Sequence, residues 1–217
     1  MSQKEDLFQA IGKGDLPIVK NIIESDPQLA ASKNEKGQSA VLLAAYSGQR
    51  NVLDFLLSQN LTLELHEAAA AGKLAHVKQI VESSPALANS FSPDGFPIAA
   101  LAAFLGHRDV TEYLISKGAD VNAISTNGSG YTALTGAVAS GQTNIVAYLI
   151  QHGADVNYRY GPGYSPLLTA AANGHLEIAK LLLTHGADAH ARTDDHQDAL
   201  SLAEARNHKE LAEYLKT

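Results

Sequence analysis

The chain has 217 residues, of which 45% are hydrophobic, and its formal net charge is -7. An acidic chain whose Lys and Arg are scattered is poorly suited to phosphate backbones or membrane surfaces, so we expect neither nucleic acid nor membrane as a partner. Cysteine is absent, which excludes disulfides, thiolate metal sites and cysteine nucleophiles.

The chain begins with a polar stretch, residues 1–6, that lacks the apolar core of a signal peptide. No later segment approaches the roughly 20 apolar residues that are needed to span a bilayer. We therefore expect a soluble, cytoplasmic protein.

A glycine follows a short, Ala-rich apolar run again and again along the chain, at intervals of 34, 24, 34, 35, 33 and 33 residues. The positions are Gly14, Gly48, Gly72, Gly106, Gly141 and Gly174, with Asn207 in the same place of a last unit. Apolar residues recur four, eight and nine positions after most of these glycines, which places them on one helical face. Each unit thus predicts a short helix, a glycine turn, a longer helix and a turn-rich finger.

The period divides the whole chain into about seven units that form a single domain. The approximate bounds are 1–36, 37–63, 64–93, 94–126, 127–160, 161–193 and 194–217. Helices this short are marginal alone, so the units must bury their apolar faces against one another.

The two end units have one uncovered side each. Lys216 replaces an apolar residue of the last unit, which predicts a polar outer side there. In the first unit, Leu7, Phe8 and Ile11 are either the packing of a cap or a contact patch.

The best-preserved unit runs from Gly163 to His175 with the sequence GYSPLLTAAANGH, followed by HGAD at His185–Asp188. Weaker versions start at Asp94 and Gly130. These repeats resemble the ankyrin family, whose units run about 33 residues with a Thr-Pro-Leu-His start. The resemblance implies an all-α curved solenoid with β-hairpin fingers along one edge, and protein partners bound on its concave surface.

Two spacings depart from the regular period. The interval between Gly48 and Gly72 is 24 residues, and residues 60–65 stand where a finger is expected. This predicts a direct helix-to-helix connection and a notch in the row of fingers, unless the repeat is misread. The finger around residues 125–130 is about two residues longer than the regular period allows. Its Asn127-Gly128 pair is a tight-turn signal.

Aromatic and polar residues fall in register at the finger tips and at the ends of the first helices. We take as candidate partner-binding residues Tyr46, Phe96, Phe104, Leu105, Tyr131, Ser140, Tyr158, Arg159, Tyr160, Tyr164 and Asn173. Rigid aromatic side chains with an arginine are common energetic anchors of interfaces. The alternative is that these rings only pack finger against finger.

The histidines mostly occupy framework positions of the repeat, such as His107 and His175 directly after the inter-helix glycine. One irregular group holds potential metal donors: His185, Asp188, His190, Asp194, Asp195, His196 and Asp198. Its spacing matches no ligand pattern, so we expect no metal and no cofactor. The chain also lacks a nucleophile elbow, a phosphate loop and a His-Glu-x-x-His motif, so we expect no catalytic residues.

We consider three possible functions. The first is a monomeric, non-catalytic interaction module, a scaffold that binds a protein partner on its concave face. The second is a regulatory or assembly subunit that docks through an end of the stack or as a homo-oligomer. The third is an enzyme or a metal-binding protein, for which the sequence offers no site.

Overall fold

A residue whose side chain caps the first helix precedes most of the helix pairs, and the structure shows why it recurs. In this computed structural model, which describes residues 2–216, the Ser39 hydroxyl accepts the backbone N–H of Leu42 at 3.2 Å. Thr132, Ser165 and Asp198 cap later first helices in the same way. A side-chain acceptor at this place satisfies a backbone donor that the helix itself leaves unpaired.

Fourteen α-helices form seven pairs within the described residues. The first helices are α1 (Gln3–Lys13), α3 (Ala40–Tyr46), α5 (Leu65–Ala70), α7 (Ile98–Phe104), α9 (Ala133–Ala139), α11 (Pro166–Asn173) and α13 (Ala199–Ala205). The second helices are α2 (Leu16–Ser25), α4 (Arg50–Leu57), α6 (Leu74–Ser83), α8 (Arg108–Ser116), α10 (Thr143–Gln151), α12 (Leu176–Thr184) and α14 (Lys209–Leu215). Two short 3₁₀ helices, η1 (Pro27–Ala31) and η2 (Pro85–Asn89), follow α2 and α6. The predicted all-α repeat architecture is confirmed.

The turn within each pair needs a left-handed residue. Gly174 ends α11 with φ of 74°, and Asn207 takes the equivalent place in the last pair with φ of 60°. Glycine pays no steric cost in this region and Asn tolerates it better than most residues, which explains the periodic glycine signal and its single replacement.

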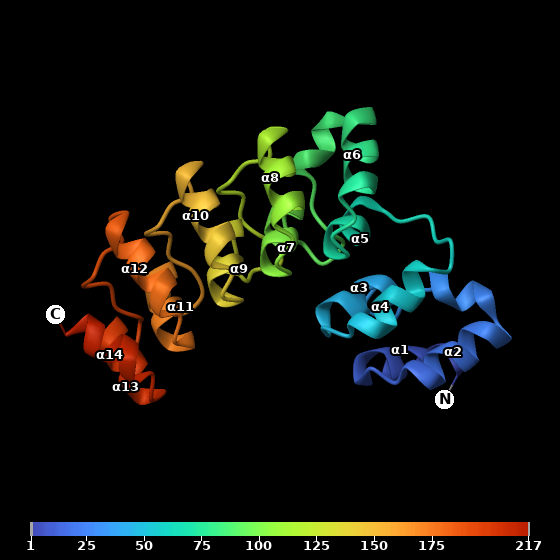
Figure 1. Cartoon of the computed structure of the whole chain (residues 1–217), viewed down its shortest axis with the longest axis horizontal. Coiled ribbons are helices and arrows are strands. Elements are labelled where there is room, and N and C mark those ends of the chain that lie inside the picture. Colours follow the sequence, from blue (N-terminus) through green and yellow to red (C-terminus); the bar gives the residue numbers. More distant parts are fainter. Residues whose placement is uncertain (1, 217) are drawn as a thin grey trace.

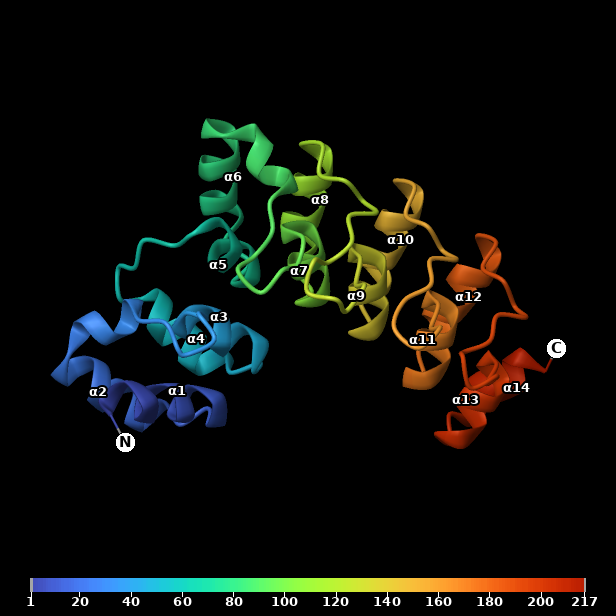
Figure 2. The same ribbon diagram turned by 180° about the vertical axis from the view of Figure 1, so that it is seen from behind.

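The helix pairs stand side by side in an arch, with α1 and α14 at opposite ends (Figure 1). From α5 onward the first helices line the inner side of the arch and the second helices its outer side, as the view from behind also shows (Figure 2). Buried alanines crowd the first helices, for example Ala68, Ala102, Ala137 and Ala170. Such small side chains let neighbouring helices approach closely along the inner side.

The fingers are tight loops rather than extended hairpins. Single antiparallel bridges close four of them, at Lys33–Ser39, Phe91–Pro97, Tyr160–Tyr164 and Arg192–Asp198. The finger before α9 is closed by the backbone N–H of Ser125, which donates to the carbonyl of Tyr131 at 2.8 Å. These loops keep the finger positions that the repeat predicts while forming almost no sheet.

Asparagine side chains link successive units on the finger side. Asn122 donates to the carbonyl of Gly153 at 3.0 Å and accepts the N–H of Asp155 at 2.9 Å. Asn89 and Asn157 make the same pair of bonds to their next units. These bonds explain why the Gly-Ala-Asp turn recurs, because its backbone receives the asparagine of the unit before it.

The finger between the second and third units is absent, as the 24-residue interval predicts. Helix α4 ends at Leu57 and α5 begins at Leu65, with an extended segment between them. The row of helix pairs changes direction at this connection (Figure 1). Leu42, Ala70 and Leu101 form a buried cluster that still joins α3, α5 and α7 beneath the gap.

The end units pack as caps. Leu7 and Ile11 are fully buried and Phe8 is 8% exposed, so the apolar residues of α1 belong to the core and not to a contact patch. At the other end, the Lys216 ammonium lies 3.3 Å from Glu204 and 3.0 Å from Glu213. The polar outer side expected of the last unit is present.

Within residues 2–216, none of the helices combines the length and the apolar character that crossing a bilayer requires.

Candidate functional site

A continuous row of aromatic rings runs along the finger side of the fourth and fifth units. The centroids of Phe96 and Tyr131 lie 6.4 Å apart, and those of Tyr131 and Tyr160 lie 5.3 Å apart. Tyr158 stacks on Tyr160 at 6.4 Å. These separations are typical of attractive ring pairs, so part of the row packs finger against finger as well as facing outward.

Where the finger is missing, the second unit contacts the fourth directly. The Tyr46 hydroxyl, at the end of α3, donates to a carboxylate oxygen of Asp94 at 2.8 Å. The other oxygen of Asp94 accepts the Ser92 hydroxyl at 2.6 Å. Burial, together with the bond to Asp94, raises the pKa of Tyr46 far above its usual value, so this hydroxyl remains a neutral donor.

A cavity of about 400 Å³ opens beside this contact, on the inner side of the arch. It is lined by Gln38, Tyr46, Asp94, Phe96, Ala100, Leu101, Phe104, Tyr131, Thr132 and Gly136. The size is within the range of pockets that hold a small ligand or one side chain of a partner. Four of its ten lining residues are aromatic and one, Asp94, carries a charge, so the cavity is an apolar pocket with a single anionic group.

Gly136 gives the cavity part of its space. Five positions before the inter-helix turn, other units carry a leucine, such as Leu43 and Leu101, where this unit has Gly136. A Cβ atom added at Gly136 would lie 3.3 Å from the Cβ of Phe104, so the helices approach closely here. The Phe104 side chain is 44% exposed, which is unusual for phenylalanine and leaves it available at the rim.

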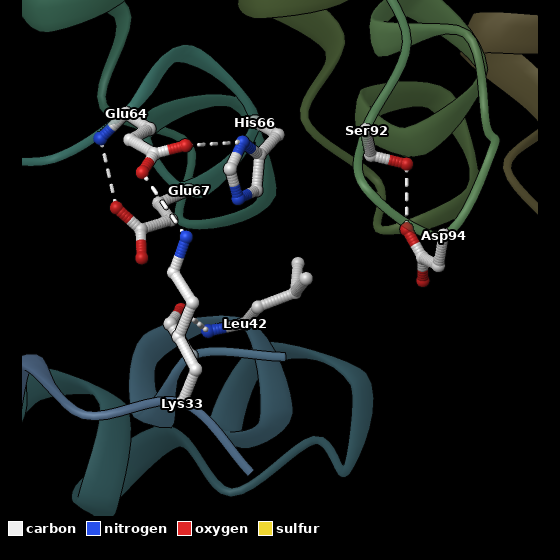
Figure 3. Close-up of polar contacts among 8 residues, drawn as sticks. Lys33, Leu42, Glu64, His66, Glu67, Ser92 and Asp94 are labelled. Atoms are coloured by element: carbon white, nitrogen blue, oxygen red, sulfur yellow. Dashed lines mark hydrogen bonds and ion pairs between the residues drawn. The ribbon is translucent and has the colours of Figure 1, made fainter. Parts of the chain in front are cut away.

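Polar side chains of Lys33, Glu64, His66 and Glu67 lie beside the gap that the missing finger leaves (Figure 3). The Lys33 ammonium lies 3.2 Å from a carboxylate oxygen of Glu64, whose second oxygen lies 3.5 Å from the His66 ring. The backbone N–H of Glu64 donates to Glu67 at 2.8 Å and so caps α5. Lys33 and Glu64 are both largely exposed, so their ion pair bridges the gap but contributes little stability.

The other predicted site residues lie apart from the cavity or support the framework. Leu105 is half-buried against the cluster beneath the gap, and Tyr164 is half-buried against the core of the later units. Three other side chains donate to backbone carbonyls: Ser140 to Gly136, Arg159 to Arg192, and Asn173 to Ala139. Their proposed role in binding stays a prediction.

The histidine and aspartate residues of the last fingers make local bonds. Asp188 accepts the backbone N–H of His190 at 2.9 Å, and His185 bonds to the carbonyl of Leu181 at 2.8 Å. No group of three or more His, Asp or Glu side chains suited to a metal ion is found among residues 2–216. His107 bonds to the carbonyl of Ala70 at 2.8 Å, as a framework role requires.

Sequence reasoning missed Asp94 and Gly136 as parts of the site. In the sequence, Asp94 only marks the start of a weaker repeat, whereas in the structure its charge distinguishes the cavity chemically. Gly136 could have been found from the sequence, because a glycine inside a helix destabilises it and therefore indicates a packing or functional role.

Comparison with known families defines the class of protein. Profiles described as "Ankyrin repeats (many copies)" match residues 7–57 and 149–203, and one described as "Ankyrin repeats (3 copies)" matches residues 65–160. The chain belongs to the ankyrin repeat family, whose members are generally protein–protein interaction modules and typically non-catalytic.

Several curated proteins share part of this sequence. "Ankyrin repeat and SAM domain-containing protein 6" of Rattus norvegicus is 30% identical over 131 residues, which is 60% of this chain and 12% of that protein. "NAD-capped RNA hydrolase NUDT12" of Homo sapiens is 35% identical over 82 residues, 38% of this chain and 17% of its own length. "Alpha-latrocrustotoxin-Lt1a" of Latrodectus tredecimguttatus is 32% identical over 116 residues, 50% of this chain and 8% of the toxin. The chain thus spans less than a fifth of each of these relatives.

Proposed function

We propose that this protein is a non-catalytic interaction module that binds a segment of a protein partner on the inner side of its arch, at the cavity beside the missing finger. The observation that carries the proposal is the joint lining of one cavity by Tyr46, Phe96, Phe104 and Tyr131, which come from three different repeats. Aromatic side chains around a pocket are the usual anchors of protein interfaces.

The shape of the surface supports the same proposal. The cavity continues into the ring row Phe96–Tyr131–Tyr160, so a partner side chain in the cavity would place its flanking residues along the finger tips. Phe104 at 44% exposed is an apolar surface that a partner would cover. An extended solenoid offers this kind of groove more readily than a closed active site.

Two variants test the location of binding from opposite directions. Phe104→Ala removes a rim contact, and Gly136→Leu fills the cavity with a residue that other repeats already carry at this position. Ile124→Ala is the matched control, because Ile124 is similarly exposed, at 48%, but lies outside the cavity.

The experiment is affinity capture from cells that produce the protein, with quantitative mass spectrometry of the bound proteins. We expect partners that the unmodified chain and Ile124→Ala retain to be lost by both cavity variants. Circular dichroism spectra would first establish that all variants are folded. Equal capture by all four proteins would show that partners bind elsewhere.

A further inference from the structure

The cavity beside the missing finger combines ring surfaces with one carboxylate, and this combination restricts what fills it. We propose that the cavity receives an arginine side chain from the partner segment, held between the aromatic residues and Asp94. The inference rests on the proposed function and names the chemistry of its anchor.

Asp94 argues against a purely apolar occupant. Each of its carboxylate oxygens accepts one protein hydrogen bond, from Ser92 and from Tyr46, so each keeps a further acceptor site. Covering this carboxylate with an apolar side chain would remove it from water without a compensating cation, which is costly. The occupant therefore brings a positive charge.

The rest of the lining argues against a small, strongly hydrated cation. Phe96, Phe104 and Tyr131 present ring surfaces, while Ala100 and Leu101 line the floor with aliphatic carbon. A guanidinium group is weakly hydrated, stacks on aromatic rings and matches both oxygens of a carboxylate, whereas an ammonium is a compact, strongly hydrated charge. The aliphatic stem of arginine would lie on the apolar floor.

The position of Asp94 is fixed before a ligand arrives. Its backbone carbonyl accepts the side-chain amide of Asn127 at 2.8 Å, and the carbonyl of Gly95 accepts the backbone N–H of Thr126 at 2.8 Å. These bonds attach the finger to its neighbour, while Tyr46 orients the carboxylate from the opposite side of the gap. A preorganised carboxylate loses little entropy when it pairs with a cation.

The charge of the whole chain is consistent with a basic partner. A net charge of -7 attracts a positively charged segment over a distance, and Asp94 then provides the short-range contact.

The test uses short capped peptides of the form Gly-Gly-Leu-Xaa-Leu-Gly-Gly, in which Xaa is arginine, citrulline, lysine or leucine. Binding to the ¹⁵N-labelled full chain is followed by NMR. We expect the arginine peptide to shift the amide signals of Asp94, Phe96 and Gly136 in a saturable way. The citrulline peptide, which keeps the shape but lacks the charge, should bind at least about tenfold more weakly.

Variants of the protein provide the reciprocal test. Asp94→Asn keeps an acceptor for the Tyr46 hydroxyl but removes the charge, and it should weaken the arginine peptide by at least about tenfold. Asp195→Asn, an exposed change on a distant finger, is the control and should leave binding unchanged. A thermal melt of each variant confirms folding.

Three results would overturn the inference: no shifts with the arginine peptide, binding of the citrulline or leucine peptide within twofold of it, or an Asp94→Asn variant that binds as the unmodified chain does. If these occur while Phe104→Ala and Gly136→Leu still abolish partner capture, the binding surface stands and only its occupant is wrong. If the arginine peptide binds but Phe104→Ala and Gly136→Leu leave partner capture unchanged, partners bind at a different place on the protein.

Discussion

The Tyr46 hydroxyl donates a hydrogen bond of 2.8 Å to Asp94, a residue 48 positions further along the chain. The contact joins the second repeat directly to the finger of the fourth, because the finger of the third repeat is missing. The same absence leaves room for the cavity that these two residues line.

Removing the Tyr46 hydroxyl should weaken this link. We expect Tyr46→Phe to lower the free energy of unfolding by about 1–2 kcal/mol, since a hydrogen bond to a charged acceptor is lost. Urea denaturation measures the effect. Tyr164→Phe is the matched control and should change stability by less than about 0.5 kcal/mol. An equal loss in both variants would mean that the bond to Asp94 adds nothing.

Truncating Leu101 and truncating Phe104, which both lie in α7, should lower the free energy of unfolding by very different amounts. Leu101 is 2% exposed and belongs to the cluster beneath the gap, so Leu101→Ala should cost about 2–4 kcal/mol. Phe104 is 44% exposed, so Phe104→Ala should cost less than about 1 kcal/mol. Chemical denaturation compares the two, and a large loss for Phe104→Ala would show that this ring is part of the core.

Alkaline pH should destabilise the protein partly through Tyr160. Burial raises the pKa of Tyr160 from 10.0 to about 12, and its hydroxyl contacts Thr169. The folded state therefore favours the neutral phenol, so the stabilisation is complete below pH 10 and is lost as the pH rises towards 12. At pH 12 the loss should be about 2 kcal/mol.

Tyr160→Phe isolates this contribution. Between pH 9 and pH 12, the variant should lose less stability than the unmodified chain in denaturation curves recorded at each pH. Parallel pH profiles would show that the ionisation of Tyr160 is not linked to folding.

Acid should act on the cap of α13. The hydroxyl and the backbone N–H of Ser201 both donate to Asp198, and these bonds lower the pKa of that carboxyl. A lowered pKa means that the cap stabilises the fold above the unfolded-state value and is lost as the pH falls through the folded-state value. Ser201→Ala should move the pKa of Asp198 upward, as a ¹³C NMR titration of the carboxyl group would show. An unchanged titration would assign the shift to other neighbours.

The number of helix pairs, their turns and the place of the missing finger can all be predicted from the amino-acid sequence. These features follow from local rules, namely helical periodicity, left-handed glycines and capping residues, which act within about ten residues of one another. The aromatic row was also visible, because residues in register fall on the same edge of a stack of equal units. The register pointed to Phe96, Tyr131 and Tyr164, whereas the rings in contact are Phe96, Tyr131 and Tyr160, and Tyr164 packs against the core of the later units.

Which of these residues share a cavity follows from the packing of the repeats and not from the repeat pattern. Losing one finger changes the direction of the stack and brings Tyr46 to Asp94, and no period in the sequence records that change. Ser140 and Asn173, which are in register with Leu105, bond to backbone carbonyls, while Gly136 and Asp94 shape the cavity. A repeat pattern specifies contacts between adjacent units, whereas contacts across an irregularity depend on how the units on both sides pack.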